Sequence, residues 1–169
     1  MRVVVGIDPG LASTGFGVVG ESHGRYRHLG HNVLHSSSSE SVGERLSAIH
    51  QALRGMIERY RPVEAAVETL YFARNVSSAM PVAQARGVLL LALHQFGVEA
   101  YEYSPQAVKL AIVGRGRAEK HQVQELVRVL LGLEALPSSD HAADALALAI
   151  CHLQSSAGMR RIRAGLARA

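Results

Sequence analysis

The sequence predicts an α/β domain in which a mixed five-stranded sheet is flanked by helices. Two observations favour this fold class. Three strand-like runs follow one another closely at the start of the chain, and strand-like runs alternate with segments of helical periodicity after residue 41. Strands joined by short turns pair as antiparallel hairpins, whereas strands joined through a helix usually pair in parallel. Both kinds of pairing are therefore expected in one sheet.

The first three predicted strands form a meander. Val3–Ile7 is a continuous apolar run of the kind found in buried strands. Gly15–Val19 is expected to pair with it across a turn that contains Pro9 and Gly10. A third strand is expected at Tyr26–Leu34, which completes the meander.

Helices and strands alternate in the rest of the chain. A capping box of Ser41 and Glu44 predicts the start of the first helix, which should end near Arg61, before Pro62. The two remaining strands are expected at Val63–Val67 and Val98–Tyr103. The remaining helices are expected at Ser78–Phe96, Gln106–Val113, Glu119–Leu131 and Ser139–Gln154.

Length and composition indicate one globular domain with a basic end. A chain of 169 residues can bury one sizeable core, which we assign to residues 1–155. Residues 156–169 form a basic C-terminal tail, which is either a solvated end or a nucleic-acid contact. No apolar run approaches the roughly 18 residues of a membrane span, and no cleavable leader is evident, so we expect a cytoplasmic protein. The single cysteine, Cys151, lies in an apolar run and is expected to be buried and structural.

The chain contains only three aspartates, and they are not scattered. Asp8 ends the first predicted strand. Asp140 and Asp144 lie four residues apart at the start of the last predicted helix, on one face. Glu68 ends the strand that follows the first helical crossover. If that strand lies beside the first, Glu68 comes close to Asp8, and the last helix can carry Asp144 over the same edge.

Such a cluster of acids repels itself unless cations neutralise it. Carboxylate oxygens suit Mg²⁺ and Mn²⁺, and two such ions about 3.5–4 Å apart serve phosphoryl transfer. The simpler explanation is that Asp140 and Asp144 only favour the helix dipole, worth about 0.3–1 kcal/mol each. That explanation suits Asp140 better than Asp8 or Glu68, which stand where buried strands end.

Several motifs together resemble those of a known family. Between Gly6 and Ile150 the chain contains, in order, GIDPGLASTGFGVV, VETLYFARN, QARGV, AEKHQVQ and DHAADALALAI. These segments resemble the motifs of the RuvC family of Holliday-junction resolvases, which belong to the RNase H-like superfamily. The resemblance covers nearly the whole chain, and several motifs in matching order are more specific than any one. It implies an RNase H-like sheet.

The resemblance also implies an activity. It suggests an endodeoxyribonuclease that acts as a homodimer on four-way DNA junctions in homologous recombination and DNA repair. Such an enzyme nicks two strands of like polarity and leaves 5′-phosphate and 3′-hydroxyl ends. The implied cofactors are two Mg²⁺ or Mn²⁺ ions per active site, and the implied partners are RuvA and RuvB, which drive branch migration. The apolar segment Val88–Leu93 is a candidate dimer surface.

Residue roles carry over motif by motif. The resemblance implies that Asp8, Glu68 and Asp144 are catalytic metal ligands. Lys109 in QAVKL and Lys120 in AEKHQVQ match basic positions near the scissile phosphate. Of these two, we expect Lys120 to be catalytic.

One position departs from the family pattern. A fourth carboxylate often stands three residues before the last aspartate, and this chain has His141 there, with Asp140 one residue earlier. We expect His141 to complete the metal site and the catalytic set, with Asp140 as the alternative. Imidazole suits Mn²⁺ better than Mg²⁺, so this site should prefer Mn²⁺.

Further DNA contacts are expected on either side of the acids. Tyr71, next to Phe72, occupies the position of an aromatic residue that stacks on unpaired junction bases, and its ring can do the same. The alternative is a half-buried aromatic residue at a strand end. The remaining residues that we expect to contact DNA are Arg74, Asn75, Arg115 and Arg117.

Three other functions compete with this interpretation. Sugar kinases, actin and heat-shock ATPases also begin with a strand, an aspartate and a glycine-rich hairpin, but they need two such domains and roughly twice this length. A related nuclease that acts on RNA or on another branched DNA is a closer rival. A junction-binding protein without catalysis is disfavoured, because acids that face a polyanion weaken binding unless metals lie between them.

Overall fold

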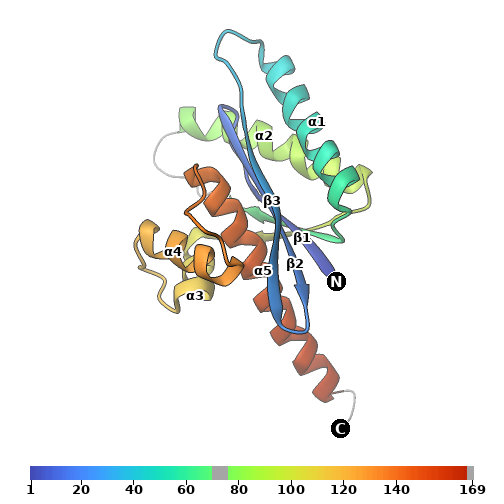
Figure 1. Ribbon diagram of the computed structural model, residues 1–169. Helices are drawn as coiled ribbons and strands as arrows, with labels where there is room; N and C mark the ends of the chain where they lie inside the picture. The colour runs from blue at the N-terminus through green and yellow to red at the C-terminus, as the bar shows by residue number, and fades with distance from the viewer. Residues whose placement is uncertain (70–75, 167–169) are drawn as a thin grey trace.

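The computed structural model describes the backbone of residues 1–69 and 76–166 and the side chains of residues 1–69 and 79–156. Within these residues it contains a mixed five-stranded sheet flanked by helices (Figure 1), as the sequence predicts. The strands are β1 (Arg2–Asp8), β2 (Ser13–Ser22), β3 (Arg25–His35), β4 (Glu64–Glu68) and β5 (Glu99–Tyr103). The helices are α1 (Val42–Tyr60), α2 (Val76–Gln95), α3 (Pro105–Val113), α4 (Lys120–Leu131) and α5 (Asp140–Leu166).

The strand order is β3-β2-β1-β4-β5. Strands β1, β2 and β3 pair antiparallel, as expected for a meander, whereas β4 runs parallel to both β1 and β5. The crossover through α1 places β4 directly beside β1. The carboxyl ends of β1 and β4 therefore meet at one edge of the sheet.

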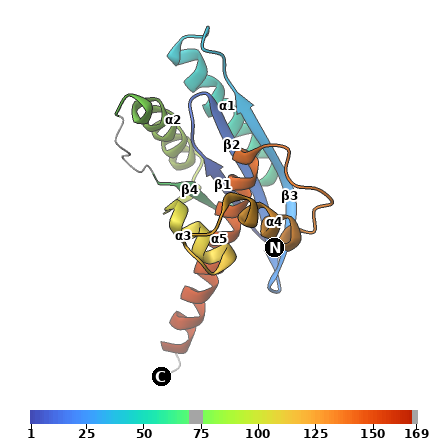
Figure 2. The ribbon, with the colours of Figure 1, turned by 90° about the vertical axis from the view of Figure 1, so that its left-hand side faces the viewer.

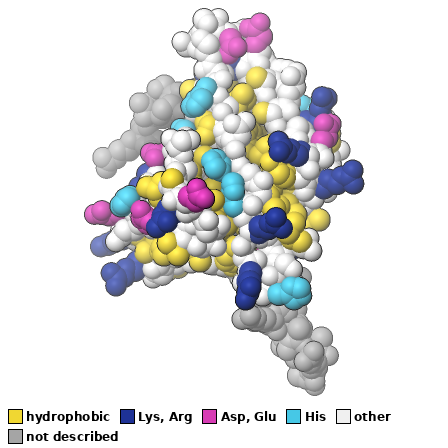
Figure 3. All heavy atoms as spheres, viewed as in Figure 1, with side chains coloured by type: hydrophobic (Ala, Val, Ile, Leu, Met, Phe, Trp, Pro, Cys, Tyr) yellow, Lys and Arg dark blue, Asp and Glu magenta, His cyan; other side chains and the backbone are white. Residues whose placement is uncertain are grey.

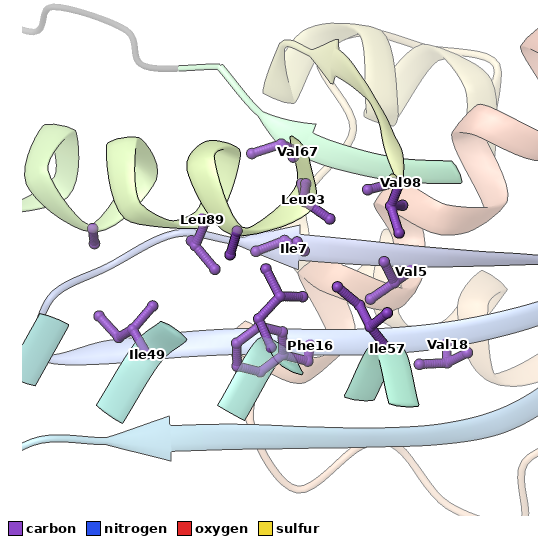
Figure 4. Packing of buried hydrophobic residues seen from close by; sticks show 14 of the residues in the cluster. Val5, Ile7, Phe16, Val18, Ile49, Ile57, Val67, Leu89, Leu93 and Val98 are labelled. Atoms are coloured by element: carbon purple, nitrogen blue, oxygen red, sulfur yellow. The ribbon is translucent and has the colours of Figure 1, made fainter. Parts of the chain in front are cut away.

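Helices cover both faces of the sheet (Figure 2). On one face, Val5 and Ile7 of β1 pack with side chains of α1 and α2, including Ile49 and Leu89, in the cluster shown in Figure 4. On the other face, Val4 belongs to a second cluster, which contains side chains of α3, α4 and α5. Alternate residues of β1 thus face opposite cores, which explains its continuous apolar run.

The capping box predicted from the sequence is present at α1. Ser41 accepts a hydrogen bond from the backbone N–H of Glu44, and the Glu44 side chain accepts one from the backbone N–H of Ser41. The helix ends at Arg61, which adopts the left-handed conformation before Pro62. The remaining boundaries agree with the predicted ones within three residues, apart from the end of α5.

The expected end of the last helix at Gln154 was wrong, because α5 continues to Leu166. The added segment contains alanine, methionine, leucine and arginine, which are good helix formers, and it contains no proline. The sequence signal was missed because apolar periodicity weakens there. Figure 1 shows this end of α5 projecting beyond the sheet.

The only cysteine of the chain, Cys151, lies in α5. Cys151 is 1% exposed, as expected for a structural residue, and burial raises the pKa of its thiol to about 11. A reactive thiolate is therefore disfavoured there. Among the described residues, no helix combines the length and apolar character that a membrane span requires.

Candidate active site

The carboxyl ends of β1 and β4 bring two acids together. Ile7 lies level with Val67 in the parallel pair, so Asp8 and Glu68 follow at the same edge. The two side chains interact, and Asp8 is 8% exposed. The proximity expected from two apolar runs that end in acids is therefore present.

Glycines in the sheet let α5 lie directly against these acids. A Cβ atom on Gly6 would overlap the carbonyl oxygen of Ala145, and one on Gly15 would overlap that of His141. Gly15 is also the residue that pairs with Asp8 across β1 and β2. A larger residue at Gly15 would push the first turn of α5 away from Asp8.

His141 reaches Asp8 from the first turn of α5. Its Nδ1 lies 2.7 Å from Asp8 Oδ2. An ionised carboxylate only accepts hydrogen bonds, so the imidazole donates. Of the two residues between which the sequence leaves a choice, His141 is the one that contacts the strand-end acids.

Asp140 faces α4 instead. Its carboxylate accepts a hydrogen bond from Gln124 Nε2 at 2.8 Å and pairs with Lys120 Nζ at 3.2 Å. These hydrogen bonds, from Gln124 and then Lys120, hold the pKa of Asp140 below its ordinary value. Lys120 Nζ also lies 3.1 Å from Asp144. One lysine therefore joins Asp140 to the edge of the acid cluster.

The acid cluster, which consists of Asp8, Glu68 and Asp144, holds more negative charge than its surroundings neutralise. Burial, followed by the charge of Asp8, raises the pKa of Glu68 to about 8. Burial also raises the pKa of Asp144, although Lys120 opposes the shift. Burial alone would lower the pKa of Lys120, but the carboxylates of Asp144 and Asp140 raise it. Clustered acids with raised pKa values are typical of functional sites.

The donors fit a hard divalent cation. Three carboxylates and one imidazole gather here, and burial together with the charge of Asp8 raises the pKa of Glu68, so a cation would favour its ionised form. Within the part of the chain that the structure describes, no group of three or more His, Cys, Asp or Glu side chains is arranged to hold a metal ion. His141 is bonded to Asp8, and Asp144 is paired with Lys120. A bound ion would compete with these two contacts.

Two hollows flank the acid cluster. The Lys109 hollow, about 150 Å³ in volume, is lined by Glu68, Asp144, Lys109, Lys120 and apolar side chains of α3, α4 and α5. The Arg45 hollow, about 440 Å³ in volume, is lined by residues 9–13, Arg45, Pro81, Val82 and His141. Lys109 and Lys120, which the sequence predicts to lie near a scissile phosphate, therefore line a hollow beside the acids.

The other predicted DNA contacts lie elsewhere. Arg115 and Arg117 are exposed in the connection between α3 and α4, and they line neither hollow. Figure 3 shows Lys and Arg side chains on this part of the surface. Four predicted contacts lie outside the residues whose side chains the structure describes: Tyr71, Phe72, Arg74 and Asn75.

Sequence reasoning missed two polar residues at this site, Arg45 and Gln124. Arg45 begins the second turn of α1, and Gln124 lies in α4. Gln124 lies in the family-like segment AEKHQVQ, in which only Lys120 was assigned a role, whereas Arg45 lies in no such motif and is one of 18 Lys and Arg residues. Only the packing of α1 and α4 brings them to the site.

Comparison with known proteins shows the family. A family model described as crossover junction endodeoxyribonuclease RuvC matches residues 4–152. The chain is 49% identical over 161 residues to the protein of that name from Roseiflexus sp., covering 95% of this chain and 96% of that one. It is 51% identical over 147 residues to the one from Treponema denticola, covering 87% and 83%.

Solved structures agree. The Thermus thermophilus RuvC structure in complex with a Holliday junction substrate matches with a TM-score of 0.89 and 39% identity, over 92% of this chain and 95% of that one. The fowlpox virus resolvase shares the fold, with a TM-score of 0.59 and 11% identity over 90% and 99% of the two chains. With its family model, its relatives and its fold in agreement, this chain belongs to the RuvC family of crossover junction endodeoxyribonucleases.

Proposed function

We propose that this protein resolves four-way DNA junctions by nicking two strands of like polarity during homologous recombination and DNA repair. Its family membership and its likeness to a junction-bound relative support the substrate. The observation that carries the reaction is the acid cluster at one edge of the sheet, in which Asp8 is buried and Glu68 and Asp144 are partly buried. Uncompensated acids weaken the binding of a polyanion, so the cluster favours cation-assisted hydrolysis over passive binding.

We infer that Asp8, Glu68, His141 and Asp144 hold Mg²⁺ or Mn²⁺, with two ions per site. When bound, such ions activate a water molecule and stabilise the leaving oxygen. The protein orients the ligands: the contact of His141 Nδ1 with Asp8 positions the ring before an ion binds, and the glycine-lined contact of α5 with the sheet keeps the acids close. Burial of Asp8 limits the access of bulk water.

Lys120 and Lys109 are the proposed phosphate-binding residues of the Lys109 hollow. The Lys120 ammonium lies 3.1 Å from Asp144, close enough to stabilise charge that develops on a scissile phosphate. Lys109 lines the same hollow from α3. Arg115 and Arg117 are exposed beyond it and would reach phosphates farther along the DNA. Stacking by Tyr71 and Phe72, with help from Arg74 and Asn75, remains a proposal from the family motif.

A homodimer suits this reaction, because two strands need two active sites. Helix α2 supports this proposal: Met80 and Leu91 are 57% and 55% exposed, and Leu91 belongs to the candidate segment Val88–Leu93. Exposed apolar side chains on one helix are typical of an interface. Partnership with RuvA and RuvB, and a cytoplasmic location, are proposed from the family alone.

We also propose that residues 1–155 form the nuclease domain and that the basic tail, residues 156–169, contacts DNA. Helix α5 links the two, because it begins at the acid cluster and continues to Leu166. Removal of residues 160–168, which contain all four arginines of the tail, should weaken junction binding and flatten its salt dependence.

A cleavage assay tests the function directly. The full chain is incubated with a labelled mobile four-way junction, a matched duplex and an RNA–DNA hybrid, each with Mg²⁺, Mn²⁺ or EDTA. The proposal expects paired nicks in the junction alone, with either ion and not with EDTA. Cleavage of the hybrid in preference to the junction would assign the protein to RNA, and junction binding without nicks in either ion would remove the catalytic role.

A further inference from the structure

The acid cluster borders two hollows, and in only one of them do the lining Lys and Arg residues have a proposed role. The Lys109 hollow contains Glu68 and Asp144, whereas the Arg45 hollow contains His141, the residue bonded to Asp8. The second hollow is formed where the β1–β2 connection, the start of α1, helix α2 and the start of α5 meet. The acid cluster therefore borders the Lys109 hollow directly and the Arg45 hollow through His141, which is bonded to Asp8.

The side chain of Arg45 is held in place. Its Nε donates to Ser36 Oγ at 2.8 Å, and Ser36 Oγ donates to the carbonyl oxygen of Leu11 at 2.5 Å. The backbone N–H of Ser36 also donates to the carbonyl oxygen of Ala12 at 3.0 Å. These contacts tie the guanidinium to the β1–β2 connection, which follows Asp8 directly. Arg45 is therefore oriented before any ligand arrives.

The outer edge of the guanidinium is available. Among the described residues, neither Nη1 nor Nη2 of Arg45 has a hydrogen bond or an ion pair. The lining of the Arg45 hollow includes no Asp or Glu side chain. The nearest acid in α1, Glu44, is engaged at the capping box with Ser41. A fixed arginine with two free amino groups, facing a hollow without acids, suits a phosphate.

We propose that the Arg45 hollow is a binding site for a phosphodiester of the strand being cut, and that Arg45 binds this phosphate through its terminal amino groups. The phosphate lies on the side of the scissile bond opposite to the phosphates that Lys109 reaches. The two hollows then hold the strand on both sides of the acids, which positions the scissile phosphate between them. This inference rests on the proposed function.

A purely structural role for Arg45 makes a different prediction. If Arg45 only braces the β1–β2 connection through Ser36, then Ser36→Ala and Arg45→Gln should be equally harmful. If Arg45 binds phosphate, Ser36→Ala should be mild, because the charge remains, and Arg45→Lys should retain part of the salt dependence. Arg54→Gln is the matched control, because Arg54 lies on the same helix and pairs with Glu58 on the surface.

Junctions with one neutral methylphosphonate supply the decisive test. The group is placed in turn at each phosphate that flanks the cut site, and single-turnover nicking and binding are measured for the wild type, Arg45→Gln, Arg54→Gln and Lys109→Gln. We expect a methylphosphonate at one position to lower nicking and binding by the wild type and by Arg54→Gln about 10- to 100-fold. At the same position it should cause no further loss in Arg45→Gln. With unmodified junctions, Arg45→Gln should lower the salt slope of binding by about one.

The positions sensed by Arg45 and by Lys109 should lie on opposite sides of the scissile phosphate. The proposal fails if every methylphosphonate penalty persists in Arg45→Gln, or if Arg45 and Lys109 sense the same side. It also fails if Ser36→Ala reproduces all effects of Arg45→Gln. A wild-type protein that does not nick the unmodified junction would instead refute the proposed function, so the two failures are distinguishable.

Discussion

The amino ends of β1 and β4 and the carboxyl ends of the same two strands both lie against α5 and carry similar side chains. The charges at the two ends are balanced differently. At the amino end, Glu64 interacts with Arg2 and with His152 of α5. At the carboxyl end, Glu68 lies next to Asp8, which is bonded to His141 of α5. The amino end has its cation on the neighbouring strand, whereas the carboxyl end has acids on both strands.

The amino end is a closed network. His152 is 1% exposed, its Nε2 lies 3.1 Å from Glu64 Oε2, and its Nδ1 lies 2.7 Å from the Tyr103 hydroxyl. Burial alone would raise the pKa of Glu64, but hydrogen bonds from His152 and Arg2 hold it below its ordinary value. Each buried charge there has a partner, so this end contributes to the attachment of α5 to the sheet.

At the carboxyl end, by contrast, the acids are not all paired with cations. Lys120 lies at its margin with its charge shared by Asp140 and Asp144, and the pKa of Glu68 is raised to about 8. Burial of an acid alone therefore does not mark a functional site. What marks it is the negative charge that the protein itself leaves without a cation.

Substitution of one acid at each end should give the largest effects. Substitution at the carboxyl end should lower nicking, whereas substitution at the amino end should lower stability. Glu68→Gln and Asp144→Asn, like Asp8→Asn, should lower nicking by about a thousandfold, because they remove metal charge. Junction binding should stay within a few-fold of the wild type. Nicking rates with Mg²⁺ and binding isotherms measure both quantities.

Glu64→Gln is the matched control for that exchange. It should lower the free energy of unfolding by about 1–3 kcal/mol, because Arg2 and His152 lose a charged acceptor, while nicking at a permissive temperature persists. Near wild-type turnover of Glu68→Gln would remove Glu68 from the ligands.

Separate substitutions of Asp140 and His141, at the start of α5, should show which of the two is a metal ligand. His141→Ala should lower nicking by at least the roughly 10–100-fold that loss of a supporting residue costs at metal sites. Asp140→Asn should be mild, because Asp140 contacts Gln124 and Lys120 rather than Asp8. Rates are compared in Mg²⁺ and in Mn²⁺. His141→Asp should gain activity with Mg²⁺, and a His141→Ala enzyme with normal rates in both ions would contradict the assignment.

Gly15→Ala should show how close packing holds the acid end together. The added Cβ would overlap the carbonyl oxygen of His141, so the variant should lose about 1–3 kcal/mol of stability and part of its activity. Gly55→Ala is the control, because a Cβ there meets nothing within 4 Å. In the interior of a helix such as α1, alanine is more stabilising than glycine by about 0.5–1 kcal/mol. Denaturant unfolding distinguishes them, and equal stability of both variants would contradict the close approach.

The last prediction concerns the pH dependence of the stability of the metal-free protein. The folded-state pKa of Glu68, about 8, exceeds its ordinary value of 4.5. Between these values the folded state retains a proton that the unfolded state has lost, so stability should fall as pH rises from about 5 to about 8. Glu68→Gln should flatten this slope, whereas Glu64→Gln should not. Unfolding curves in EDTA check the sign, and stability that rises over this range in the wild type would oppose it.

Local patterns in the sequence determined most of the fold. The capping box of Ser41 and Glu44, the apolar strand runs and the helical periodicities depend on neighbours in the chain, and the structure contains them near the predicted places. The acids at the ends of two strands also pointed to one edge of a sheet, since parallel neighbours must end together. The end of α5 was missed because good helix formers continue the helix without an apolar stripe to reveal it.

Only the tertiary structure decided how the site is arranged. Asp140 and His141 are adjacent in the chain, yet one faces α4 and the other faces Asp8, because successive residues of a helix point about 100° apart. The contact of Gly15 with α5 and the tie from Arg45 through Ser36 to Leu11 join residues from separate elements. No local pattern encodes such contacts, because they exist only once both faces of the sheet are covered and the helices have taken their positions.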